Sequence, residues 1–205
     1  MNKAWSALSL LTANRLRTRG DAAAGAVYLS FDDGPHPQHT EPLLDLLAQH
    51  GAKATFFLLG QLAQAHPAIV RRILAEGHAI GNHSMTHPRM PALGAASQWA
   101  EIRSADAVLA QFDGRPRHPF RPPNGRVTLA GLAACLWRWQ PLVLWSIDSQ
   151  DYCLGPDDVI QRLQARPMVD GDVLLFHDDG ACAGQALRAL LPLWRQAGCR
   201  FRALA

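Results

Sequence analysis

The feature that most constrains the fold of this chain is its alternation of short apolar runs with longer amphipathic ones. Seven short runs are rich in Val, Ile, Leu and Phe and are bounded by turn residues, as β-strands are: Ala26–Phe31, Ala54–Leu59, Ala79–Asn82, His118–Arg121, Leu142–Ile147, Val173–His177 and Phe201–Leu204. Six runs between them carry apolar residues at helical spacing: Thr40–His50, Gln61–Glu76, Ala95–Phe112, Thr128–Arg138, Asp157–Arg166 and Gln185–Ala197. This order predicts an α/β fold with a parallel sheet covered by helices. About seven strands in this length predict a closed or nearly closed barrel.

Length and composition narrow the class of protein. The 205 residues suit a single domain with a sizeable core. The formal net charge is only +3 and the arginines are mostly scattered, so we expect no nucleic-acid partner. The four cysteines are far apart and show no metal-ligand spacing: Cys135, Cys153, Cys182 and Cys199. We therefore expect free thiols, which fit a reducing compartment.

We interpret residues 1–25 as an N-terminal segment that can form a helix. It precedes the main domain, residues 26–205. Its apolar stretch, Ala4–Ala13, is too short to span a bilayer and is not followed by a small-residue cleavage site. One helix face would hold four apolar residues: Trp5, Leu8, Leu11 and Leu16. This helix either packs on the domain's own core or makes weak membrane contact. We expect a cytoplasmic protein, with inner-membrane anchoring or export as the alternative.

Polar residues fall where five of the predicted strands end. These residues are Asp32, His83, Arg121, Asp148 and His177. In barrels of alternating strands and helices, reactive residues collect at the C-terminal ends of the strands. The sequence therefore predicts one active site at that edge of the sheet.

The first two segments contain a set of metal ligands. Asp32 and Asp33 are adjacent carboxylates, and burying both is costly unless a cation or a donor compensates. The alternative is a solvated turn in which one Asp caps the next helix. His83 and His87 are spaced to chelate a divalent ion, although most such pairs bind nothing, and Pro88 favours a tight loop over a helix. Two histidines and one aspartate would leave metal positions open for water and substrate, as in catalytic sites.

The later segments contain candidates for holding and moving protons. Two prolines stiffen the segment after Arg121, which suits a guanidinium that grips a carboxylate; the alternative is a surface turn. His177 ends an apolar strand and is either a general acid or a histidine with satisfied hydrogen bonds in the core.

Taken in order, five segments resemble the motifs of the polysaccharide deacetylases of carbohydrate esterase family 4, the NodB-homology domain. They are Ser30–Pro35, His83–His87, Arg121–Gly125, Asp148–Tyr152 and Leu175–His177. The resemblance covers roughly residues 26 to 204. It implies a distorted, incomplete (β/α) barrel and a catalytic domain over residues 26–205.

The resemblance also implies a role for each motif residue. One divalent ion would be bound by Asp33, His83 and His87. Zn²⁺ is the preferred assignment, and Co²⁺, Ni²⁺ or Mn²⁺ are alternatives. Asp32 would be the general base, Arg121 would hold it, and His177 would be the general acid. Asp148, favoured over Asp151, would orient His177. The substrate and the oxyanion would be bound by Asn124, Pro123, Tyr152 and Leu175.

The implied activity is hydrolysis of an N-acetyl group from an amino sugar in a saccharide or glycoconjugate, with release of acetate. Three positions depart from the residues that are common in the family: Ser30 stands in place of Thr, Asn124 in place of an aromatic residue and Tyr152 in place of Trp. Two alternatives remain: a deacylase of an O-acetyl ester or a non-sugar amide that uses the same site, and a non-catalytic carbohydrate-binding protein. The resemblance implies no particular oligomeric state.

Overall fold

The sheet is built around strand β2 (Ala26–Asp32), whose seven residues are all buried. In the computed structural model, which describes residues 16–23 and 25–204, β2 pairs in parallel with β3 (Ala54–Leu58) and with β7 (Val173–His177). Strands β4 (Ala79–Asn82) and β6 (Ile147–Asp148) extend the sheet in the order β4-β3-β2-β7-β6. β8 (Arg200–Phe201) pairs with the start of β2. Strands buried on both faces are typical of parallel sheets.

A second, two-stranded sheet of β1 (Leu16–Arg17) and β5 (Leu142–Val143) makes the barrel incomplete. Phe120 connects the two sheets because it bridges to Asn82 on one side and to Leu142 on the other. The predicted strand at residues 118–121 is reduced to this bridge, and the predicted strand at residues 142–147 is divided into β5 and β6. The prediction of a distorted, incomplete α/β barrel is confirmed.

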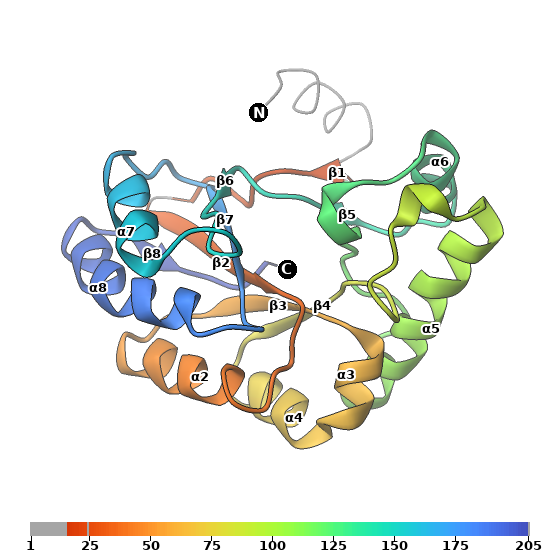
Figure 1. Cartoon of the computed structure of the whole chain (residues 1–205), viewed down its shortest axis with the longest axis horizontal. Coiled ribbons are helices and arrows are strands. Elements are labelled where there is room, and N and C mark those ends of the chain that lie inside the picture. The colour runs from red at the N-terminus through yellow and green to blue at the C-terminus, as the bar shows by residue number, and fades with distance from the viewer. Residues whose placement is uncertain (1–15, 24, 205) are drawn as a thin grey trace.

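The helices cover the outside of the strands, as Figure 1 shows. The α-helices are α2 (Thr40–Gln49), α3 (Gly60–Ala65), α4 (Pro67–Ala75), α5 (Ala95–Asp113), α6 (Leu129–Trp137), α7 (Pro156–Gln164) and α8 (Cys182–Gln196), and the 3₁₀ turns are η1 (Met90–Ala92) and η2 (Pro123–Gly125). The prediction of a single helix over residues 61–76 is wrong, because α3 and α4 are separate helices. The helical run breaks at His66 (φ −126°, ψ 57°), because Pro67 disfavours a helical residue before it.

The N-terminal segment differs from the expected helix in its described part. Leu16 belongs to β1, and its fully buried side chain packs with Phe120, Cys135 and Leu142. The rest of the predicted helix face, Trp5, Leu8 and Leu11, lies outside the described residues. Within residues 16–23 and 25–204, no helix is long and apolar enough to cross a bilayer. The four cysteines are free, as predicted.

Alternation along β2 separates the core from the inside of the barrel. The Phe31 ring contacts Phe56 of β3 and Phe176 of β7, with ring centroids 5.1 and 5.9 Å apart, and belongs to the large apolar cluster that includes leucines of α2 and α8. Successive side chains of a strand point to opposite faces. Ser30 and Asp32 therefore point the other way, into the barrel, where their partners lie.

We expect Phe31→Ala to lower the free energy of unfolding by about 3–5 kcal/mol, because it leaves a cavity between two packed rings. Urea denaturation followed by circular dichroism measures the loss. Leu129→Ala is the control: its side chain is 86% exposed, so its effect should stay within about 0.5 kcal/mol. Equal effects of the two substitutions would contradict this description of the core.

Candidate active site

The strand register brings the predicted site residues together at one edge of the sheet. Asp32, the last residue of β2, is the direct neighbour of His177, the last residue of β7. A cleft of about 350 Å³ opens at this edge. Its lining contains residues from all five motifs and two residues outside them, Trp145 and Asp179. The motif residues of the lining are Asp32, Asp33, His83, His87, Asn124, Gly125, Asp148, Tyr152, Leu175 and His177.

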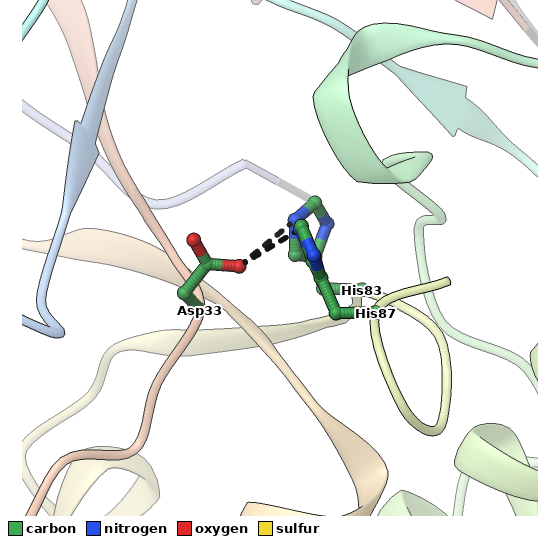
Figure 2. Close-up of side chains that lie close together, drawn as sticks. All are labelled: Asp33, His83 and His87. Carbon is green, nitrogen blue, oxygen red and sulfur yellow. Dashed lines mark ion pairs between the residues drawn. The ribbon is translucent and has the colours of Figure 1, made fainter. Parts of the chain in front are cut away.

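The side chains of Asp33, His83 and His87 point toward one another, as Figure 2 shows, and all three line the cleft. Asp33 Oδ1 lies 3.4 Å from Nε2 of His83 and 3.2 Å from Nε2 of His87. One candidate ligand atom from each residue lies within 4.8 Å of the others. The predicted cluster of one carboxylate and two imidazoles is therefore present in space.

Hydrogen bonding orients His83 and leaves Asp33 Oδ1 without a hydrogen-bond partner among the described residues. His83 Nδ1 lies 2.7 Å from the carbonyl oxygen of Arg121. A carbonyl only accepts, so Nδ1 carries the hydrogen and Nε2 presents a lone pair toward Asp33. Asp33 Oδ1 is itself buried and has no hydrogen-bond partner among the described residues. A cation between these acceptors would satisfy both, and a histidine that donates its other N–H to a carbonyl is the usual arrangement of a metal ligand.

The pKa shifts of the cluster favour the forms that bind metals. Burial alone would raise the pKa of Asp33, but the close approach of His83 and the fields of the nearby histidines outweigh it, so the pKa is lowered. Burial lowers the pKa of His87, with opposition from Asp33. A carboxylate and a neutral imidazole are the ligand forms of these side chains.

Arg121 lies fully buried inside the barrel and holds Asp32, as the sequence predicted. Its Nη1 donates to Asp32 Oδ1 at 2.7 Å and to Ser30 Oγ at 2.9 Å. Two backbone carbonyls accept from its other nitrogens, and its guanidinium carbon lies 3.9 Å from the ring centroid of Phe57. Burial lowers the pKa of Arg121, and Asp32 opposes that shift. The other oxygen of Asp32 lies 3.7 Å from His83 Nε2, on the cleft side.

His177 is oriented by Asp151, so the preference for Asp148 was wrong. Asp151 Oδ1 lies 2.8 Å from His177 Nδ1, and its Oδ2 accepts from the backbone N–H of His177 at 2.8 Å. Ser149 Oγ donates to Asp151 at 2.9 Å. Burial would lower the pKa of His177, but Asp151 and the two aspartates of the first motif outweigh it and raise the pKa to about 9.

Asp148 has a different environment because the chain reverses after β6. Its Oδ1 accepts from the backbone N–H of Gln150, whose φ of 63° turns Asp151 back beneath His177. Tyr152 donates its hydroxyl to Asp148 Oδ2 at 3.4 Å. Asp148 therefore belongs to the lining of the cleft and does not contact His177.

The predicted substrate-binding residues divide into two groups. Asn124, Tyr152 and Leu175 line the cleft, and the Tyr152 ring stands edge-on to the ring of His177 at 5.3 Å. Pro123 is buried and is not part of the lining described for the cleft, so its contact with substrate stays a prediction. Pro123 is the first residue of η2, and the next residue, Asn124, adopts a φ of 55°.

Sequence reasoning missed Trp145, Gly125 and Asp179 as parts of the cleft wall. Trp145 lies in a run that was predicted as one buried strand, which gave no sign of exposure. It packs against Gly125, where an added Cβ would lie 2.7 Å from the indole. The pairing of a glycine with a large aromatic side chain from a distant segment has no signal in a single sequence.

An incomplete (β/α) barrel with a histidine–aspartate cluster at the C-terminal ends of its strands defines a candidate metal-dependent hydrolase. Residues 19–134 match the family model for polysaccharide deacetylases. The chain therefore belongs to the polysaccharide deacetylase family, which is a metal-dependent family of deacetylases.

Named relatives and solved structures agree with this family. The chain is 35% identical over 175 residues to a chitooligosaccharide deacetylase of Sinorhizobium fredii, covering 80% of this chain and 77% of the relative. It is 33% identical over 201 residues to a peptidoglycan-N-acetylglucosamine deacetylase of Bacillus cereus, covering 96% and 73%. The crystal structure of the Bc1960 peptidoglycan N-acetylglucosamine deacetylase superimposes with a TM-score of 0.88 at 31% identity, covering 98% and 95%. A family 4 carbohydrate esterase from Streptomyces lividans in complex with acetate gives 0.81 at 32% identity, covering 90% and 95%.

We expect Asp151→Asn to lower the pKa of His177 by about 1–3 pH units in the metal-free protein, because it removes the anion that offsets burial. NMR titration of the His177 ring measures the shift. In the wild type the folded-state pKa lies above the ordinary value of 6.5. The interaction of protonated His177 with Asp151 therefore contributes fully to the free energy of unfolding below about pH 6.5. This contribution is lost as the pH rises through about 9.

The free energy of unfolding of the wild type should consequently fall more steeply between these two pH values than that of Asp151→Asn. Asp148→Asn is the control, because Asp148 does not contact His177. An unchanged His177 titration in Asp151→Asn would contradict the assignment.

Proposed function

We propose that this protein hydrolyses the N-acetyl group of an amino sugar in an oligosaccharide, polysaccharide or glycoconjugate, with release of acetate and a free amine. The observation that carries the proposal is Asp33 Oδ1, a buried and unpartnered anion that faces two imidazole nitrogens. The carboxylate of Asp32 and the imidazole of His177 line the same cleft. The names of the relatives from Sinorhizobium fredii and Bacillus cereus support the substrate class.

We infer that Asp33, His83 and His87 hold Zn²⁺, with Co²⁺, Ni²⁺ or Mn²⁺ as functional substitutes. Two imidazole nitrogens and one carboxylate oxygen suit zinc and leave positions open, as catalytic zinc sites do. A bound divalent ion supplies Lewis acidity, which makes water more acidic and polarises the acetyl carbonyl.

Asp32 is placed to act as the general base. One of its oxygens is held by Arg121 at 2.7 Å, which leaves the other oxygen on the cleft side near His83. That oxygen accepts a proton from the attacking water. Because Arg121 is buried and makes further hydrogen bonds to backbone carbonyls, it holds the carboxylate in one orientation.

His177 is placed to act as the general acid. Its pKa of about 9 keeps the imidazole protonated at neutral pH. Nδ1 is held by Asp151, so Nε2 carries the proton that goes to the departing nitrogen. An amide nitrogen leaves poorly unless it is protonated, and a positioned acid or base contributes roughly 10²–10⁴-fold.

The remaining wall of the cleft suits a sugar. We propose that the backbone N–H of Asn124 donates to the oxyanion that forms on the acetyl carbon, as donors in such sites do. Tyr152 and Trp145 offer aromatic surface, and Leu175 provides an apolar floor. Tyr152 is 59% exposed, so its ring is open to a bound chain.

The purified chain loaded with Zn²⁺ should release acetate from chitooligosaccharides, and Asp33→Ala or His83→Ala should reduce the rate by ~10²-fold or more. Acetate is measured by a coupled assay, and zinc content is measured in the same samples. Asp157→Ala and His50→Ala are matched controls that remove the same side-chain types at residues outside the lining described for the cleft. Undiminished activity in Asp33→Ala would overturn the proposal.

We expect Asp151→Asn to lower kcat on the same substrate by ~10²-fold, because His177 loses its orienting anion. Asp148→Asn touches the wall of the cleft and should change KM more than kcat. Steady-state kinetics with both variants separate the two roles. A large loss of kcat in Asp148→Asn with little change in Asp151→Asn would indicate that Asp148, and not Asp151, orients His177.

A further inference from the structure

The loops that carry the candidate ligands contain unfavourable backbone conformations. Asp33 has a φ of 75°, Ser84 of 76° and His87 of 58°. Residues other than glycine rarely adopt this left-handed region, and such conformations persist only when the surroundings determine them. Two of the three residues are themselves members of the cluster in Figure 2. Something outside the cluster must therefore hold both loops.

Glu101 of α5 holds the loop between the two histidines. Its Oε2 accepts from the backbone N–H groups of Met85 and Thr86 at 3.0 and 2.9 Å, and its Oε1 accepts from the Thr86 hydroxyl at 3.1 Å. One carboxylate thus binds three donors between His83 and His87. Because an ionised carboxylate accepts at both oxygens and donates at neither, it matches three donors better than an amide does.

Asp178 holds the turn that contains Asp33. Its Oδ2 accepts from the Thr40 hydroxyl at 2.5 Å, and the same hydroxyl accepts from the backbone N–H of His36 at 2.7 Å. The backbone N–H of Asp178 donates to the carbonyl of Asp32 at 3.2 Å. Both ends of the turn are therefore connected to one buried residue.

The packing of this turn leaves little freedom. A Cβ added at Gly34 would lie 2.4 Å from each oxygen of Asp178, so the carboxylate lies directly against the backbone of the turn. Asp178 is 1% exposed and Thr40 is fully buried. Neither Glu101, Asp178 nor Thr40 belongs to the lining described for the cleft.

We propose that Glu101 and Asp178, the latter through Thr40, are positioning residues that set the affinity of the Asp33–His83–His87 cluster for its divalent ion. This inference rests on the proposed function, because it takes the cluster to be a metal site. Without these hydrogen bonds, the loops relax toward ordinary backbone conformations and the ligand atoms separate. Ion binding must then restore the strained conformations, so the affinity falls.

The test measures Zn²⁺ affinity of the full chain by competition with a chromophoric chelator. Glu101→Gln replaces one acceptor oxygen by a donor and should weaken affinity by ~10-fold or more, as losses around metal ligands do. Thr40→Val removes the hydroxyl that connects Asp178 to the turn containing Asp33, so it should weaken Zn²⁺ affinity similarly. Thr40→Ser keeps the hydroxyl and should keep the affinity. The two effects should multiply in the double variant, because they act on separate loops.

Val70→Ala is the control for general destabilisation, because it removes buried volume in α4 without touching either loop. It should lower the midpoint of thermal unfolding and leave Zn²⁺ affinity unchanged. A second readout is activity at saturating Zn²⁺: Glu101→Gln should recover most of its activity there, because its ligands are intact.

Unchanged Zn²⁺ affinity in folded Glu101→Gln and Thr40→Val, with tight binding by the wild type, would overturn this inference alone. Loss of thermal stability without loss of affinity would overturn it in the same way, by assigning the two residues a structural role only. Absence of Zn²⁺ binding by the wild type would overturn the proposed function as well.

Discussion

The buried contact of Arg121 with Asp32 is the interaction on which the site depends. The guanidinium crosses the inside of the barrel to reach Asp32 and Ser30 on β2, while the backbone carbonyl of the same residue accepts from His83. One residue therefore orients the candidate base and one candidate ligand. Removing one partner of a buried ion pair leaves an uncompensated charge and typically costs about 3–5 kcal/mol. Stability and the geometry of the site are thus linked at this point of the chain.

Sequence patterns predicted those parts of the fold and the site that depend on strand order. Parallel strands bring their carboxyl ends to one edge, so Asp33, His83 and His87 could be assigned to one cluster before their distances were known. The residues alone predicted only that Arg121 grips a carboxylate, and the resemblance to the family implied that this carboxylate is Asp32. The prediction of the Asp33–His83–His87 cluster needs only the order of elements and the residues at the strand ends.

Predictions failed where a local turn decided the direction of the chain. Asp148 was favoured over Asp151 as the partner of His177, but the left-handed Gln150 directs Asp151 toward His177 instead. Pro67 divides one amphipathic pattern into α3 and α4, although the apolar spacing continues across it. Backbone reversals of this kind depend on single φ values, which periodicity does not contain.

The close packing of Gly125 against Trp145 limits how this enzyme can change its preference for substrates. Any side chain at position 125 would collide with the indole, so that part of the wall is fixed. Asn124 and Tyr152 are exposed and can vary without disturbing the core beneath them. Substitutions at these two exposed positions can therefore change the shape of the cleft, while the glycine–indole contact stays constant.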